Sequence, residues 1–114
     1  MKKLLTLLAL LSFHSGAYAV GEASRYIADY VRADKTGFGY VKFTQPLAGT
    51  PAACIGGGHT NHLAFDTKTD GGKAILAVVL SAQATGNPVI ARGTGTCDQY
   101  TMVESWSFGY VVKP

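Results

Sequence analysis

Hydrophobic and polar side chains alternate along several short stretches of the chain, which is the pattern of half-buried β-strands. In residues 38–45, Val41 and Phe43 fall on one side of an extended backbone, while Tyr40 and Lys42 fall on the other. The same alternation, with many Val, Ile and aromatic residues, predicts four further strands, at residues 24–33, 61–66, 89–93 and 102–112.

One segment follows a helical period instead. Residues 73–85 are rich in Ala, Leu and Val, and they are followed by Gly86 and Pro88, which are typical of a helix end. The predicted order is therefore three strands, one helix and two strands. Because closure leaves no exposed strand edges, this order predicts a small five-stranded OB-like barrel that is mostly β with one helix.

The predicted helix has two contrasting faces. Many of its larger apolar residues share a broad face that suits a core. The opposite face consists of small rather than charged residues, namely Lys73, Ala74, Ala77, Ser81 and Ala84. Since helix faces that contact water are usually more polar, we expect this second face to form an oligomer interface. Exposed alanine favoured by helix propensity alone is the alternative.

Aromatic residues occur on four of the five predicted strands. Trp106, Phe108 and Tyr110 alternate along the last strand, which predicts that they face the core; a platform for bases or sugars is the alternative. Tyrosines in the first two strands have polar or charged neighbours and are better candidates for exposed rings. A sugar site needs a ring face with hydrogen-bond donors nearby. The candidate ligand-binding residues are therefore Tyr26, Tyr30, Tyr40 and Lys42.

The N-terminus has the three regions of a secretory signal peptide in the right order. Residues 1–3 are basic, residues 4–11 are apolar, and residues 17–19 (Ala-Tyr-Ala) have the small-x-small pattern of a cleavage site. The apolar run is much shorter than the ~20 residues of a membrane-spanning helix. We expect cleavage after residue 19, which leaves residues 20–114 as one exported domain, either secreted or periplasmic.

The predicted mature chain contains two cysteines, Cys54 and Cys97. An exported protein meets an oxidising compartment, and a small core benefits from a covalent link, so we expect one disulfide. A reactive cysteine that works with a histidine is the alternative. Removal of the signal peptide leaves eight basic and seven acidic residues, scattered along the chain. Nucleic-acid binders usually carry a basic stripe, so no nucleic-acid partner is expected.

Candidate catalytic and metal-binding motifs are weak. His59 and His62 are three residues apart in a loop or strand, where a sheet would turn them to opposite sides, and no third ligand has a suitable spacing. Two glycine-rich runs lack the Lys-Ser/Thr ending of a phosphate loop. A triad can be drawn from Ser105, His62 and Asp66, but no nucleophile elbow accompanies it. We therefore expect no enzyme, no metal and no cofactor.

Three runs in the middle of the chain are similar to one known family. They are residues 49–54 (Gly-Thr-Pro-Ala-Ala-Cys), 82–86 (Ala-Gln-Ala-Thr-Gly) and 87–91 (Asn-Pro-Val-Ile-Ala). They resemble the receptor-binding B subunits of AB5 toxins, in particular the subtilase-cytotoxin and typhoid-toxin type. The resemblance implies an exported, disulfide-bonded OB-fold that forms pentameric rings, binds sialylated glycans and partners a catalytic A-type subunit.

These observations favour an exported OB-like barrel that binds a cell-surface glycan as a homo-oligomer. A periplasmic or secreted interaction or inhibitor protein without sugar binding is the first alternative. A small secreted enzyme is the second.

Overall fold

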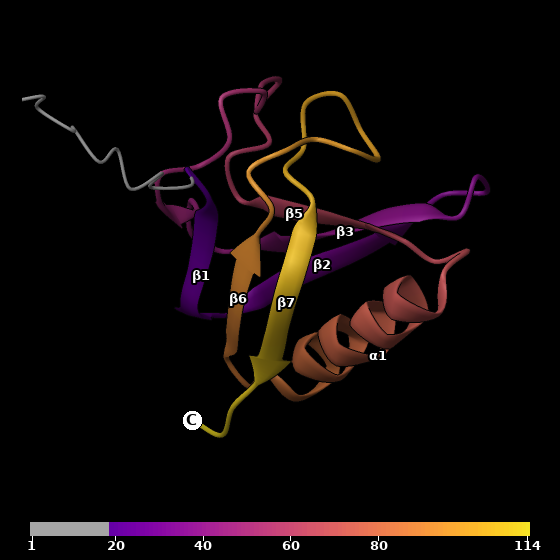
Figure 1. Ribbon diagram of the computed structural model, residues 1–114. Helices are drawn as coiled ribbons and strands as arrows, with labels where there is room; N and C mark the ends of the chain where they lie inside the picture. Colours follow the sequence, from indigo (N-terminus) through magenta and orange to yellow (C-terminus); the bar gives the residue numbers. More distant parts are fainter. Residues whose placement is uncertain (1–18) are drawn as a thin grey trace, which may run out of the picture.

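The computed structural model describes residues 19–114, which contain seven β-strands and one α-helix (Figure 1). Residues 1–18, which hold nearly all of the predicted signal peptide, lie outside the described residues. The elements are β1 (Gly21–Tyr26), β2 (Ala28–Ala33), β3 (Phe38–Phe43), β4 (Ala48–Gly49), β5 (His62–Asp66), α1 (Asp70–Thr85), β6 (Val89–Gly93) and β7 (Trp106–Val111). In this part of the chain, no helix is long and apolar enough to cross a membrane.

The strands form two antiparallel sheets, with the orders β4-β1-β6-β7 and β2-β3-β5. The expected mostly β fold with one helix is therefore confirmed. The sheets do not close into the predicted barrel. The strand order differs as well, because the first predicted strand is divided into β1 and β2, and the short β4 is added. An isolated parallel bridge between Ala64 and Ser105 connects β5 to the segment before β7.

The chain passes from one sheet to the other between β1 and β2, at an irregular stretch of backbone. Arg25 has a left-handed φ of 65°, and the register of β1 against β6 shifts between Ser24 and Tyr26. This irregularity turns Tyr26 into the core, where it is 8% exposed and packs edge-on against Phe43, with the ring centroids 6.0 Å apart. The expectation that the Tyr26 ring is exposed is therefore wrong.

The helix begins three residues earlier than predicted because Thr69 caps it. The Thr69 hydroxyl accepts a hydrogen bond from the backbone N–H of Gly72 at 2.9 Å, and Asp70 in the first turn complements the positive end of the helix dipole. The helix ends as predicted, where Gly86 adopts a left-handed φ of 73° and donates from its N–H to the carbonyl of Ala82.

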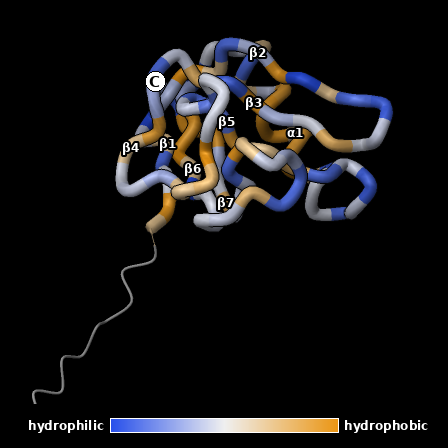
Figure 2. Tube along the Cα trace, turned by 90° about the horizontal axis from the view of Figure 1, so that it is seen from above, coloured by the Kyte–Doolittle hydropathy of each residue, from blue (hydrophilic) through white to orange (hydrophobic). Residues whose placement is uncertain are grey.

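The core lies between the two sheets and one face of α1. In Figure 2, hydrophobic segments of the strands and of α1 gather toward the middle of the domain. The largest fully buried apolar side chains are Phe43, Phe65, Leu63, Val41, Val79, Val89 and Val103. The residues expected at an oligomer interface are all exposed in the single chain: Lys73, Ala74, Ala77, Ser81 and Ala84. Their part in an oligomer stays a prediction.

The aromatic residues of β7 face both sides of the sheet, and not the core alone as predicted. The register of β7 against β6 shifts at Ser107, which is the extra residue of a β-bulge. A bulge reverses the side to which the following side chains point. Trp106 is therefore buried, whereas Phe108 and Tyr110 are 53% and 50% exposed.

A buried carboxylate joins three distant segments at one end of the domain. Glu104, which is fully buried, accepts hydrogen bonds from the backbone N–H groups of Gly21 at 2.8 Å, Ala52 at 2.8 Å and Gly95 at 3.1 Å. These groups belong to the first strand and to the two long loops that follow β4 and β6. Backbone amides, rather than a basic side chain, therefore hold this carboxylate.

The same two loops are linked covalently. The predicted disulfide between Cys54 and Cys97 is confirmed, with an S–S distance of 2.01 Å and 43 residues of sequence separation. Glu104 and the disulfide thus act together to fix the loops against the end of the β4-β1-β6-β7 sheet.

Candidate functional site

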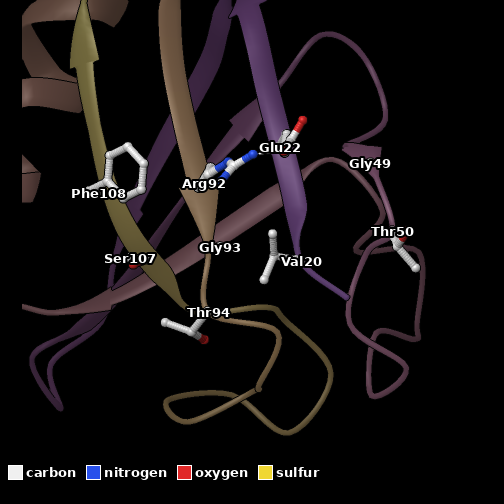
Figure 3. Close-up of a pocket in the computed structure, with 9 residues that line it drawn as sticks. All are labelled: Val20, Glu22, Gly49, Thr50, Arg92, Gly93, Thr94, Ser107 and Phe108. Atoms are coloured by element: carbon white, nitrogen blue, oxygen red, sulfur yellow. Dashed lines mark ion pairs between the residues drawn. The ribbon is translucent and has the colours of Figure 1, made fainter. Parts of the chain in front are cut away.

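A groove of about 570 Å³ opens on the outer face of the β4-β1-β6-β7 sheet, at the end where the fixed loops begin (Figure 3). It is lined by Val20, Glu22, Gly49, Thr50, Arg92, Gly93, Thr94, Ser107 and Phe108. These residues come from the start of β1, the end of β4, the end of β6 and the start of β7. The groove therefore depends on the pairing of strands that are far apart in the sequence.

An ion pair lies across the floor of the groove. Glu22 and Arg92 are paired residues on β1 and β6, and their side chains meet at 2.7 Å between Glu22 Oε1 and Arg92 Nη2. The Arg92 side chain is 54% exposed and the Glu22 side chain 33% exposed, so a ligand can reach both groups. A guanidinium has five N–H donors. One contact to Glu22 therefore leaves donors of Arg92 available.

An exposed aromatic ring stands beside this ion pair. Phe108 is the cross-strand partner of Arg92 on β7, and Figure 3 shows the two side chains on adjacent strands of the same face. The ring is exposed because the bulge at Ser107 turns it away from the core. An apolar ring beside a charged donor and acceptor is the composition of many small-molecule sites.

Hydroxyl groups and glycine backbone complete the rim. Thr50, Thr94 and Ser107 carry hydroxyls, and the Thr94 hydroxyl lies 2.8 Å from that of Thr96. Gly93 must be glycine, because a Cβ there would stand 1.8 Å from Glu104 Oε2. The buried carboxylate that fixes the loops thus also requires glycine at this edge of the groove.

The ligand-binding residues predicted from the sequence lie elsewhere. Tyr30 and Lys42 are cross-strand partners on the outer face of the other sheet, where the Lys42 Nζ stands 5.5 Å from the Tyr30 ring centroid and pairs with Asp29 at 3.4 Å. Tyr30 is 42% exposed, but Tyr40 is only 5% exposed, so the expectation of an exposed Tyr40 ring is wrong. Tyr26, the fourth predicted ligand-binding residue, is buried in the core. The structure brings none of these residues to the groove.

Tyr40 belongs to a polar network whose side chains are hydrogen-bonded to one another. Arg32 donates to Asp34 at 2.8 Å and to the Tyr40 hydroxyl at 2.9 Å, while the Tyr100 hydroxyl donates to Asp34. The hydrogen bond from Tyr100, followed by that from Arg32, lowers the pKa of Asp34. Burial, followed by the bond to Asp34, raises the pKa of Tyr100. These partners leave little hydrogen-bonding capacity for a ligand.

The three residues considered for a triad have other partners. Ser105 donates to Gln99 at 2.8 Å, and its hydroxyl accepts from the N–H of Asp98 at 2.9 Å. Asp66 accepts from the N–H of Lys68 at 2.9 Å in a local turn. None of these hydrogen bonds joins Ser105 to a histidine or a histidine to Asp66.

Sequence reasoning missed the groove for two physical reasons. The register between β1 and β6, which places Glu22 opposite Arg92, cannot be read from either strand alone. Unbroken alternation across Ser107 predicts a core position for Phe108, and the bulge at Ser107 breaks that alternation. The signal that was available is Ser107 followed by the Phe108-Gly109 pair, since glycine within a strand often accompanies an irregular backbone.

Comparison of the chain with known protein families, curated protein sequences and solved structures found no match in any of the three.

Proposed function

We propose that this protein is an exported binding protein whose groove takes a cell-surface glycan. The observation that carries the proposal is the exposed Phe108 ring beside the Glu22–Arg92 pair in a groove of about 570 Å³. A sugar presents an apolar C–H face that packs on an aromatic ring, and hydroxyls that donate to a carboxylate and accept from a guanidinium. The threonine and serine hydroxyls at the rim add further partners.

We also propose that the two sheets are the two parts of one OB-like barrel that is only partly closed. Strand neighbours support this reading: β2 pairs with β3, β3 with β5, β6 with β7 and β1 with β6. The bridge between Ala64 and Ser105 and the bend between β1 and β2 then lie at the two places where the sheets meet. This arrangement is the one that the resemblance to toxin B subunits implies, and it leaves the groove on the outside of the barrel.

Phe108→Ala should weaken glycan binding at least ~10-fold, because it removes the only aromatic surface among the groove residues. Arg92→Ala should have a similar effect through the loss of its donors. A glycan array would identify the ligand, and calorimetry with that glycan would compare the variants. Tyr110→Ala is a matched control, since Tyr110 is equally exposed on β7 but does not line the groove.

Equal glycan binding by Phe108→Ala and the unmodified protein would show that the groove is not the glycan site. A blank array, with sialylated and neutral glycans both present, would instead favour the alternative of a secreted or periplasmic interaction protein.

Self-association is the second part of the proposed function. The exposed small-residue face of α1 would form the shared surface of a homo-oligomer, a pentameric ring by the resemblance, with a catalytic A-type subunit as a further partner. Single sugar sites are weak, and linked copies can raise the apparent affinity by ~10²–10⁴. An oligomer therefore suits a shallow groove.

Ala77→Glu should dissociate the oligomer and leave each domain folded, because it places a charge in the interface at a position that is exposed in the single chain. Light scattering would give the mass, and circular dichroism would check the fold. Gln83→Glu, on another side of the helix, is the control and should leave the mass unchanged. A single-subunit mass for the unmodified protein at micromolar concentrations would rule out the ring.

A further inference from the structure

The outer face of the β2-β3-β5 sheet carries two histidines that lie side by side, away from the groove. His62 begins β5 and pairs with Lys42 of β3, and His59 precedes it in the loop. Their ring centroids are 5.0 Å apart, with 70° between the ring planes. The expectation that they face opposite sides is wrong, because His59 lies outside the strand and its ring packs near Tyr40, at 5.8 Å between centroids.

The tautomer of His59 follows from its hydrogen bond. His59 Nδ1 lies 2.9 Å from the carbonyl oxygen of Gly56. A carbonyl oxygen can only accept, so Nδ1 carries the proton and donates it. In the neutral ring, the lone pair is then on Nε2. Metal-bound histidines typically have this arrangement, with one ring nitrogen donating to a carbonyl and the other free to coordinate.

His62 is buried, and its ring nitrogens are poorly hydrogen-bonded. It is 5% exposed, and its Nδ1 has no hydrogen-bond partner in the structure. Its other nitrogen, Nε2, lies 3.5 Å from the Tyr30 hydroxyl, which is a long hydrogen bond. A buried polar atom without a partner is unfavourable and calls for a functional or structural explanation.

His62 Nδ1 has no hydrogen-bond partner, so a ring nitrogen of this residue is available to a metal ion. A neutral imidazole has a lone pair that no proton occupies, and imidazole in this form is a common ligand of late first-row metal ions.

We propose that His59 and His62 bind a divalent transition-metal ion, Cu²⁺ in preference to Zn²⁺, through one imidazole nitrogen of each ring. Within residues 19–114 there is no group of three or more His, Cys, Asp or Glu that could hold a metal. The described residues therefore supply two imidazole nitrogens, and the remaining coordination positions would be left to water. Imidazole binds Cu²⁺ most strongly in the divalent series.

The positive charges around the two histidines should lower the affinity for Cu²⁺, but they do not prevent its binding. Lys42 is the cross-strand partner of His62 on β3 and places a positive charge beside the pair. Its charge is offset by Asp29 at 3.4 Å, and that of Arg32 by Asp34 at 2.8 Å. Lys42→Gln should therefore strengthen Cu²⁺ binding a few-fold, since it removes a repelling charge.

Titration of the tag-free exported protein with Cu²⁺ tests the site. We expect saturable binding of one ion per chain by calorimetry, and an electron paramagnetic resonance spectrum with coordination by two imidazole nitrogens. His59→Gln should weaken binding ~10–100-fold or more. Thr60→Ala, in the same exposed loop between the two histidines, should bind Cu²⁺ as the unmodified protein does.

Two results would overturn the proposal: no saturable Cu²⁺ binding, or equal binding by His59→Gln and the unmodified protein. His62→Gln changes a buried position, so its melting temperature is measured alongside; the loop variant His59→Gln keeps the test valid if His62→Gln fails to fold. Glycan binding in the groove should be the same in all of these variants, because the two sites lie on different sheets.

Discussion

Replacing Glu104 with alanine should leave the domain largely unfolded under conditions in which the unmodified protein is stable. The change removes the acceptor of three backbone N–H groups, those of Gly21, Ala52 and Gly95, and leaves all three donors without their partner. A buried donor left without its acceptor typically costs ~1–3 kcal/mol, so the loss of three acceptors should cost several kcal/mol. Small domains have only ~5–15 kcal/mol of total stability. Urea unfolding followed by circular dichroism would measure the loss.

Two further variants distinguish the loss of these hydrogen bonds from the general effect of removing a negative charge. Glu104→Gln keeps the shape but puts an amide N–H₂ where an acceptor oxygen is needed, so it should also destabilise, by ~1–3 kcal/mol. Glu22→Gln removes a carboxylate from the solvent-accessible ion pair with Arg92 and should change the free energy of unfolding by less than ~1 kcal/mol. Similar stabilities for Glu104→Ala and Glu22→Gln would contradict a structural role of Glu104.

Cys97→Ser should lower the free energy of unfolding by ~2–5 kcal/mol, the usual cost of removing a disulfide from a small secreted domain. The bond between Cys54 and Cys97 closes a long loop, with a sequence separation of 43 residues, so its loss frees much of the unfolded chain. For a domain of this size the melting temperature should fall by about 10 °C or more.

Reduction of the unmodified protein provides the matching control, since it should lower the melting temperature to about that of Cys97→Ser. A variant within ~0.5 kcal/mol of the unmodified protein would show that Glu104 and the core hold the loops without the disulfide. Since both loops border the groove, we also expect reduced protein to bind its ligand less tightly even where it stays folded.

The parts of the fold that depend on local sequence were predictable. The strand at 89–93 has the predicted boundaries, and α1 ends as its glycine indicates. The disulfide followed from a single cysteine pair in a chain that is expected to be exported. These features depend on residues that are neighbours in the sequence or have no alternative partner.

The parts that depend on irregular backbone were not predictable. The left-handed Arg25 and the bulge at Ser107 each break the alternation of two, and the exposures of Tyr26 and Phe108 consequently differ from those expected. The role of Glu104 was missed for another reason. A carboxylate held by backbone amides from three distant segments leaves no motif in the sequence.

The pairing of His59 with His62 was excluded on the assumption that both lie in one strand. The strand begins only at His62, so the rule that neighbours at odd spacing face opposite sides does not apply. The boundary of a strand, which sequence patterns locate least well, decided this assignment.

A glycan bound in the groove on the β4-β1-β6-β7 sheet should contact the residues that line it. Two-dimensional NMR of the ¹⁵N-labelled protein, titrated with a glycan identified on the array, tests this binding residue by residue. We expect amide shifts confined to the groove, at Val20, Thr50, Arg92, Thr94, Ser107 and Phe108. Amide shifts that instead cluster around Tyr30 and Lys42, or no shifts at saturating glycan, would show that the groove does not bind the glycan.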